Sequence, residues 1–367
     1  MINKTRASNL QPFSGLTPEV VLDAAAAFGL APDGRLFALN SYENRVYQLG
    51  AGDSQLVLKF YRPQRWSDAQ IAEEHEFTQE LAAAELAVAA PLIIGGQTLF
   101  RYEDFRFAAF PWMRGRAVEL DAPEARPMLG RSLARIHRIG AARAFRVRPR
   151  VGVERLGWEA RAQVLESPLL PDALRERYGT VSAALLERIS ESFAAAAGTR
   201  DIRLHGDCHL GNLLWNEHGP VFVDLDDCAS GVAVQDLWMM LSGSPAEQQR
   251  QWSELLEGYQ QFADFDFREV RLIEPLRSLR MLHHAAWVAH RWNDPAFPRA
   301  FPWAGEPRYW EGYLQDLMTR SVPSMSLRCC TSECQVPTSY VRPGAQTRYC
   351  RAPRAHPRRA RKSPRSC

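Results

Sequence analysis

Three polar side chains within one short segment have the residue types and the spacing that phosphoryl transfer requires. Residues 204–227 read LHGDCHLGNLLWNEHGPVFVDLDD, which places Asp207 five residues before Asn212 and seventeen before Asp224. A carboxylate can orient and deprotonate an attacking hydroxyl, while an amide and a second carboxylate can hold Mg²⁺ against nucleotide phosphates. The segment therefore predicts an ATP- and Mg²⁺-dependent phosphotransferase.

Each of these three residues has an expected role. Asp207 would accept or orient the hydroxyl proton. Asn212 and Asp224 would be hard oxygen ligands to Mg²⁺, which usually takes few protein ligands beside phosphates. The D-x-x-x-x-N spacing is also that of the protein-kinase catalytic loop, here with His-Gly-Asp in place of His-Arg-Asp. We therefore predict catalytic roles for Asp207 and Asp224 and metal binding by Asn212 and Asp224.

Upstream residues would bind the phosphate donor, ATP. Lys59 follows the apolar residues 56–58, and a lysine at the end of a buried strand can pair with the α- and β-phosphates if a helix carboxylate fixes it. Of three glutamates on the next expected helix, we select Glu74 as this partner. The loop of residues 39–45 is not glycine-rich, but Ser41 would present its hydroxyl or a backbone N–H group to the phosphates.

Other polar residues of the segment have simpler interpretations. His205 and His209 are spaced like a helical zinc pair, but the glycine between them indicates a loop and no third ligand stands nearby, so we expect structural roles. Cys208 sits beside the presumed base but has no base of its own, which argues against nucleophilic catalysis. Asp226, two residues after Asp224, fits a turn with a self-capped backbone.

Two groups of elements must position these residues. In residues 1–110 we expect a helix capped by Thr17 and a second helix opening at Ser67 and ending near residue 84. Four strands are expected at 45–49, 55–60, 97–101 and 105–110, within a five-stranded sheet. From residue 111 onward, helical periodicity covers 126–139, 171–175, 181–197, 246–262 and 269–292, with short strands at 202–204, 213–215 and 221–223.

This pattern predicts an α+β fold with two lobes. Residues 1–110 would form a small nucleotide-binding lobe of sheet and helix, and residues 111–320 a larger, mainly helical catalytic and substrate lobe. Nucleotides usually bind between such lobes. The chain has 367 residues, 46% hydrophobic and 24% charged, which is ordinary for a globular protein. It has no signal peptide and no apolar run long enough to span a membrane, so we expect a cytoplasmic protein without a membrane partner.

The overall charge of +3 conceals a basic tail. Residues 321–367 hold ten Lys or Arg against one acidic residue, while residues 1–320 hold 35 basic and 41 acidic residues. Five of the seven cysteines and six prolines also lie in the tail. Because the tail has no periodic apolar pattern, we expect it to be disordered.

Three interpretations of the tail remain open. A basic arm for nucleic acid is a weak signal without aromatic interleaving, and the cysteine spacing lacks the paired C-x-x-C frame of a zinc site. We favour translation in a shifted reading frame, because the composition changes abruptly after Arg320. The tail is therefore set apart from the fold, and nucleic acid is not an expected partner.

The motifs together resemble the aminoglycoside phosphotransferase and choline kinase superfamily. The resemblance rests on LHGDCHLGN and VDLDD, with NSYENRVY and VLKFYRP in the small lobe. Within the superfamily the chain is similar to bacterial Ser/Thr protein kinases, on LNSYENRVYQ, KFYRPQRW, EEHEF, VQDLWMML and RWNDPAFPRAFPW. The resemblance covers the body of the chain and ends before the tail.

That resemblance implies a bilobal protein-kinase-like fold and transfer of the ATP γ-phosphate to protein Ser/Thr hydroxyls, with autophosphorylation and a role in stress response and protection from cell death. By position it implies that Asp207 is the base, that Asn212 and Asp224 bind Mg²⁺, that Ser41 contacts ATP and that Asp236 braces the catalytic loop. We expect a monomer.

One scaffold serves several acceptors, so two alternatives stay open. The first is a small-molecule kinase of the aminoglycoside, choline or homoserine type, and the second is a catalytically inactive binding module. A kinase for polycationic antibiotics would need an acidic pocket, and the helical lobe shows no unusual acidic cluster outside the catalytic segment. The sequence therefore favours an acceptor that is not cationic.

Overall fold

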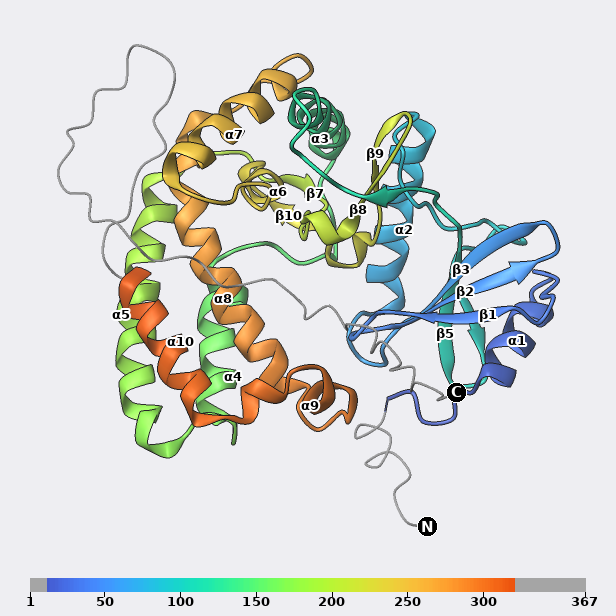
Figure 1. Ribbon diagram of the computed structural model, residues 1–367, viewed down its shortest axis with the longest axis horizontal. Helices are drawn as coiled ribbons and strands as arrows, with labels where there is room; N and C mark the ends of the chain where they lie inside the picture. Colours follow the sequence, from blue (N-terminus) through green and yellow to red (C-terminus); the bar gives the residue numbers. More distant parts are fainter. Residues whose placement is uncertain (1–11, 321–367) are drawn as a thin grey trace, which may run out of the picture. The chain divides into compact units, whose positions relative to one another are not determined.

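The structure of the chain is a computed structural model that describes residues 12–320 (Figure 1). The predictions made for residues 321–367, namely disorder, a nucleic-acid arm, a zinc site or a shifted frame, lie outside the described residues. In the described part of the chain, no helix is both long and apolar enough to cross a bilayer.

A small lobe is built on a five-stranded antiparallel sheet with strand order β1-β2-β3-β5-β4. Its elements are α1 (Pro18–Ala27), β1 (Leu36–Leu39), β2 (Arg45–Ala51), β3 (Ser54–Phe60), α2 (Asp68–Ala83), β4 (Phe100–Tyr102) and β5 (Phe105–Pro111). Thr17 and Ser67 cap the two helices as predicted. Strand β4 starts later than expected, because Ile94 and Gln97 close a tight turn before it.

Strand β3 is central in the sheet, and its side chains alternate between the two faces. Leu58 and Phe60, both fully buried, join Val21 of α1 in the core of the small lobe. Lys59 and Tyr61 point to the opposite face and contact α2. The period of the strand thus directs the lysine toward the long helix rather than into the apolar core.

Helix α2 buries side chains on two sides. Ile71 packs with the face of the sheet opposite α1, and Glu74 lies one helical turn further along the same side. Phe77 and Leu81 belong to the core of the large lobe. Glu73 points elsewhere and accepts hydrogen bonds from the backbone N–H groups of residues 146–148. The helical period therefore sends only one of these neighbouring glutamates to Lys59.

The large lobe combines helices with short strands (Figure 1). Its helices are α3 (Ala125–Ala142), α4 (Ala160–Glu166), α5 (Asp172–Ala195), α6 (Val234–Trp238), α7 (Pro245–Tyr259), α8 (Ile273–His290), α9 (Ala296–Ala300) and α10 (Pro307–Arg320). Its strands are β6 (Arg116–Ala117), β7 (Ile202–Leu204), β8 (Leu213–Asn216), β9 (Gly219–Phe222) and β10 (Ala229–Gly231). A π-helical turn at Glu154–Glu159 leads into α4.

One helix prediction was wrong in detail. Residues 171–175 and 181–197 were expected as separate helical segments, but α5 is continuous from Asp172 to Ala195. The polar and glycine-containing stretch between them has weak helical propensity. Tyr178 and Ser182 are nonetheless fully buried, and Arg161 of α4 donates a hydrogen bond to the carbonyl of Gly179. Packing against α4 therefore overrides local propensity.

Helix α10 packs into the core of the large lobe. Its Trp310, Tyr313, Leu314 and Leu317 side chains are buried, and the Trp310 indole N–H donates to the carbonyl of Ala304 at 3.0 Å. In Figure 1, α10 runs beside α5 and α8, with α4 in the same group of helices. The helical body of the fold is therefore complete up to residue 320.

Glu269 provides a pH-dependent test of the large-lobe core. Its side chain is buried, and its carboxylate accepts a hydrogen bond from Val234 N, the first residue of α6, at 2.8 Å. Burial raises the pKa of Glu269, and the hydrogen bonds from the backbone N–H groups of Val234 and Ala233 offset this only in part. The resulting pKa is about 7. The folded protein therefore holds a proton that the unfolded chain, with its lower carboxyl pKa, releases in the same pH range.

We expect the stability contribution of Glu269 to be complete below about pH 4.5 and to be lost as the pH rises through about 7. The loss would amount to roughly 3 kcal/mol. Glu269→Gln should remove this part of the pH dependence. Urea unfolding at pH 5 and pH 8 would measure it, with the exposed Glu187→Gln as the control. An identical pH response of the wild type and Glu269→Gln would show that this carboxyl does not change ionisation on folding.

Candidate active site

The segment carrying Asp207 is a loop between β7 and β8, and its backbone is hydrogen-bonded to one buried carboxylate. Asp236, at the start of α6 and completely buried, accepts hydrogen bonds from His205 N and Gly206 N, both at 2.8 Å. Its carboxylate also contacts His137 Nε2 of α3 at 3.2 Å. Asp236 thus fixes the loop backbone directly before Asp207, as the resemblance implied, and His137 positions the Asp236 carboxylate.

Gly206 explains why this loop has His-Gly-Asp in place of His-Arg-Asp. Its φ of +86° lies in the left-handed region, and a Cβ atom there would come within 2.2 Å of the Asp227 carbonyl oxygen. Only glycine fits such a conformation at such a close backbone approach. The same approach brings the loop of Asp207 against the short helical turn that follows Asp224.

Both carboxylate oxygens of Asp207 have partners. His209 Nδ1 accepts a hydrogen bond from Gly211 N at 2.9 Å, so its Nε2 carries the proton and faces Asp207 Oδ2 at 3.3 Å. Arg280 of α8 forms an ion pair with Asp207 Oδ1. Burial would raise the pKa of Asp207, but the His209 hydrogen bond and the Arg280 charge hold it well below its usual range. The carboxylate is therefore ionised and able to accept a proton.

Asn212 is oriented by its own loop. Its Nδ2 donates to the Asp207 carbonyl at 3.0 Å, and its backbone N–H donates to the His209 carbonyl at 2.9 Å. Because the amide nitrogen is used in this way, the amide oxygen points away from the loop backbone. Among residues 12–320 no donor hydrogen-bonds to this oxygen, so it is available to a ligand.

Asp224 follows the end of β9, and two backbone hydrogen bonds fix the residues just before it. Phe222 N donates to the Ala87 carbonyl at 2.8 Å, and Val223 N donates to the Asn212 carbonyl at 3.0 Å. Asp224 itself has a left-handed φ of +57°, which aspartate tolerates better than most residues. Its side chain is 52% exposed. The strand ends with a carboxylate turned out of the large-lobe core, next to the loop of Asn212.

Lys59 connects the small lobe to this segment. Its Nζ lies 3.4 Å from Glu74 Oε1, 3.0 Å from Asp224 Oδ1 and 3.0 Å from Asp226 Oδ1. Burial would lower the pKa of Lys59, but the three carboxylates raise it well above its ordinary value, so the amine is charged. Burial raises the pKa of Glu74 to about 7. The structure thus brings three of the predicted site residues, Lys59, Glu74 and Asp224, into contact.

Asp226 is a site residue that sequence reasoning missed, since the pattern was taken for a self-capped turn. It is 2% exposed and forms ion pairs with Lys59 and Arg65. Burial would raise the pKa of Asp226, but the Arg65 and Lys59 charges hold it below the usual range. Asn44 Nδ2 donates to its Oδ2 at 3.1 Å. The signal available in the sequence was the second acidic position of VDLDD.

The loop carrying Ser41 is held against the large lobe. Glu43, two residues on, accepts hydrogen bonds from Trp287 Nε1 at 2.6 Å and Arg291 Nη2 at 2.8 Å, both from the C-terminal end of α8. Arg62 lies 3.1 Å from the same carboxylate and bonds Asp294 at 2.7 Å. In the described part of the chain, nothing hydrogen-bonds the Ser41 hydroxyl. Sequence reasoning had no signal for these contacts, because the partners are more than 200 residues apart.

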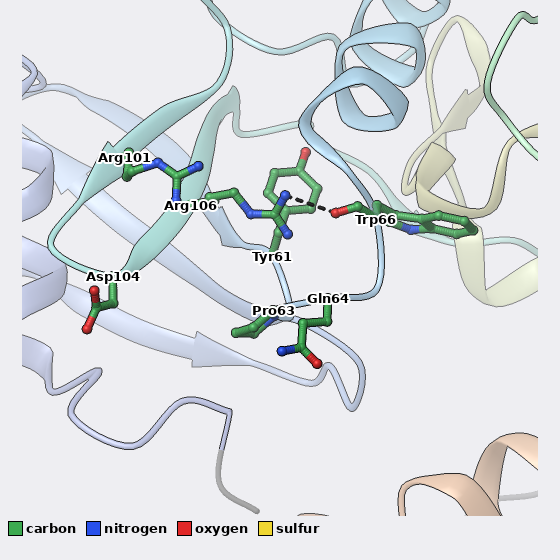
Figure 2. Close-up of a pocket in the computed structure, with 7 residues that line it drawn as sticks. All are labelled: Tyr61, Pro63, Gln64, Trp66, Arg101, Asp104 and Arg106. Carbon is green, nitrogen blue, oxygen red and sulfur yellow. Dashed lines mark hydrogen bonds between the residues drawn. The ribbon is translucent and has the colours of Figure 1, made fainter. Parts of the chain in front are cut away.

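A pocket of about 280 Å³ lies beside this region, on the small lobe (Figure 2). It is lined by residues from the end of β3, the following loop and the β4–β5 hairpin, including Tyr61, Gln64 and Arg106. Arg106 Nη1 donates to the Trp66 carbonyl at 2.9 Å and pairs with Asp68 at 2.7 Å. None of the predicted site residues lines this pocket, so it is separate from the candidate site.

The residues of the candidate site suit Mg²⁺ held by few protein ligands. Within residues 12–320, no group of three or more His, Cys, Asp or Glu side chains forms a metal cage. The uncommitted amide oxygen of Asn212 and the half-exposed carboxylate of Asp224 are hard oxygen donors, the type that Mg²⁺ prefers when phosphates complete its coordination. The donor chemistry therefore fits the predicted metal.

The family of the chain follows from comparison with known proteins. The family model described as the phosphotransferase enzyme family matches residues 36–273. The chain belongs to this family. That span contains the residues of the candidate site from Ser41 to Asp236.

Two relatives match this chain over most of its length and most of theirs. Stress response kinase A of Salmonella choleraesuis (strain SC-B67) is 43% identical over 304 residues, which cover 83% of this chain and 92% of that protein. Serine/threonine protein kinase RdoA of Salmonella typhimurium (strain LT2) has the same identity and coverage. The expected resemblance to kinases of this superfamily is confirmed.

Solved structures confirm the fold of this phosphotransferase. Amicoumacin kinase hAmiN, in complex with AMP-PNP, Ca²⁺ and Ami, superposes with a TM-score of 0.64 over 82% of this chain and 93% of that one, at 19% sequence identity. The microcompartment-associated aminopropanol kinase has a TM-score of 0.57 at 20% identity, covering 83% of this chain and 100% of that one. The α+β, bilobal kinase-like architecture is therefore correct.

Replacement of Lys59 tests the phosphate-binding role. Lys59→Ala removes the cation that three carboxylates surround, and we expect transfer to fall by a factor of about 10²–10³, the usual cost of losing one electrostatic stabiliser. Glu74→Gln should cost less, because Asp224 and Asp226 still hold the amine. Initial rates of phosphoryl transfer from labelled ATP would measure both. Equal losses in the two variants would show that Glu74 is needed for more than orienting Lys59.

Proposed function

We propose that this phosphotransferase is an ATP- and Mg²⁺-dependent protein serine/threonine kinase. The acceptor hydroxyl would attack the γ-phosphorus of ATP and the bond to ADP would break, while the hydroxyl proton passes to Asp207. Lys59, fixed by Glu74, would bind the α- and β-phosphates, and Ser41 would contact ATP from its loop. Asn212 and Asp224 would hold Mg²⁺, which neutralises phosphate charge when bound.

One observation carries this proposal. The buried cation of Lys59 and the exposed end of β9 meet at Asp224, while the ionised Asp207 stands on an adjoining loop that Asp236 holds rigid. Phosphoryl transfer needs little else from a protein than a cation for the donor phosphates and a positioned base for the acceptor. The arrangement also weighs against a catalytically inactive binding module, because each of these groups is intact.

A protein acceptor is supported by the relatives and by the charge of the site. A relative that is 43% identical across 92% of its length is named a serine/threonine protein kinase. A kinase for a polycationic antibiotic would need carboxylates near the base, whereas the side chain beside Asp207 is Arg280. We further propose autophosphorylation, a stress-response role, a cytoplasmic location and action as a monomer; the name of the relative stress response kinase A supports the stress-response role.

The proposal is tested with radiolabelled ATP and Mg²⁺. The protein would be incubated alone, with a generic protein substrate, and with a panel of aminoglycosides, choline, homoserine and amino alcohols. We expect labelled protein and no labelled small molecule. Transfer to a small molecule with unlabelled protein would establish the small-molecule kinase instead. Nucleotide binding without transfer to any acceptor would establish the inactive module.

A further inference from the structure

The environment of Asp207 contains more positive charge than the chemistry described so far uses. Arg280 of α8 occupies Asp207 Oδ1, although its side chain is 44% exposed and has no other hydrogen bond or ion pair in the described part of the chain. His209 holds the other oxygen at 3.3 Å. An acceptor hydroxyl must hydrogen-bond to one of these oxygens before the proton can move. A carboxylate oxygen can accept more than one hydrogen bond, but the Arg280 guanidinium competes with the acceptor hydroxyl for Asp207 Oδ1.

A second arginine lies near Arg280 without a carboxylate of its own. Arg155 is half-buried on the π-helical turn Glu154–Glu159, and within residues 12–320 no ion pair or hydrogen bond engages its guanidinium. The guanidinium instead lies over the Trp66 ring, 5.8 Å from its centroid. A carboxylate of this region, that of Asp227, is bound by Arg65 at 2.7 and 2.9 Å. The charges of Asp227 and Glu159 act on Arg155, but among residues 12–320 neither carboxylate forms an ion pair with it.

The turn that carries Arg155 and the helix that carries Arg280 are neighbours in the fold. The π-helical turn packs on α8, where a Cβ on Gly157 would lie 3.0 Å from Leu279 Cδ2, next to Arg280. His283 lies one turn beyond Arg280, and the charges of both arginines act on its imidazole. Burial and the positive charges of Arg155, Arg65 and Arg280 together lower the pKa of His283 to about 4. His283 therefore stays neutral and adds no positive charge of its own. We call the two arginines the Arg155–Arg280 pair.

Such a pair is suited to an anionic ligand. A guanidinium binds carboxylate or phosphate oxygens with two parallel hydrogen bonds, and an exposed, flexible arginine can exchange one carboxylate for another. π-Helical turns are rare and are found mainly at functional sites. The Arg280 cation beside the base would also repel a polycationic acceptor by like-charge contact.

We propose that the Arg155–Arg280 pair selects acceptors that carry an acidic group beside the hydroxyl, and that this group frees Asp207 by taking over Arg280. For a protein acceptor this means Ser or Thr flanked by Asp or Glu. The inference rests on the proposed function and names its substrate class. Arg280 is a specificity-determining residue here, because it recognises the acceptor and controls access to the base without taking a proton.

A peptide series tests the selection. Serine peptides would carry Glu, Gln or Lys at each flanking position in turn, and kcat/KM would be measured for each. We expect at least one position where Glu exceeds Gln about tenfold and Lys is slowest, the size of one charge-assisted pair. Arg280→Glu should reverse this order, and Arg155→Glu should weaken it. Arg308→Ala, an exposed arginine on α10, is the matched control and should leave the order unchanged.

A second measurement separates selection from a structural effect. Arg280→Ala should raise ATP hydrolysis in the absence of acceptor, because Asp207 Oδ1 becomes open to water, while kcat/KM for the acidic peptide falls. A misfolded variant would lose both activities. Peptide phosphorylation that ignores flanking charge would overturn this inference and leave the kinase proposal standing. Transfer to a small molecule without phosphorylation of any peptide would overturn the protein-kinase proposal itself.

Discussion

Asp207→Asn should reduce phosphoryl transfer by a factor of about 10³ or more while leaving Mg²⁺-nucleotide affinity within about twofold. The amide cannot accept the hydroxyl proton, and general base catalysis commonly contributes factors of about 10²–10⁴. The loop itself should keep its conformation, because Asp236, not Asp207, binds the His205 and Gly206 backbone. Transfer rates from labelled ATP and calorimetric nucleotide titration would measure the two effects separately.

A neighbouring aspartate supplies the control for this prediction. Asp201 lies just before β7 on the same segment, is exposed, and pairs only with Arg150 at the surface. Exposed ion pairs contribute little, so Asp201→Asn should leave both transfer and nucleotide affinity unchanged. Wild-type turnover in Asp207→Asn would show that another group takes the proton, and His209, beside Asp207 Oδ2, would then be the first candidate.

Asp224 and Asp226 should respond to the same substitution in opposite ways. Asp224 is half-exposed, and asparagine tolerates its left-handed backbone, so Asp224→Asn should fold normally. We expect it to lose nucleotide affinity measured with Mg²⁺ at least tenfold and transfer by about 10² or more, because a metal ligand and a partner of Lys59 are removed.

Asp226→Asn should instead destabilise the fold. Its carboxylate is buried between Lys59 and Arg65, and removing one member of a buried ionic cluster leaves charge uncompensated, at a cost of about 3–5 kcal/mol. Thermal unfolding of both variants would compare them, with nucleotide titration at a temperature where both are folded. A lower melting temperature for Asp224→Asn than for Asp226→Asn would reverse our assignment of the two residues.

The lobe contacts give these predictions a common physical basis. Lys59, Arg62 and Arg65 come from the end of β3 and the loop after it, and all three bind carboxylates of the large lobe. Glu43 makes the reciprocal contact to Trp287 of α8 and to Arg291, the residue after its end. The end of β3 and the loop after it are thus tied by charge to the segment of Asp224 and Asp227, so changes in this network should alter nucleotide binding and stability together.

Local patterns in the sequence were sufficient for most of the small lobe. The Thr17 and Ser67 caps, the β2–β3 hairpin and the choice of Glu74 all follow from interactions within a few residues or from a single period. Prediction failed where tertiary contacts override propensity. The glycine-containing middle of α5 is helical because Tyr178 and Ser182 are buried against other helices.

The motifs LHGDCHLGN and VDLDD by themselves predicted a phosphotransferase, because the proposed base, amide and metal-binding carboxylate stand at fixed short spacings. Tertiary structure alone decided which groups surround them. Asp226 became a buried partner of Lys59, 167 residues away, and Arg280 reached Asp207 across 73 residues. Such pairings depend on how helices and strands pack, since neither sequence spacing nor residue type specifies which distant charges will meet.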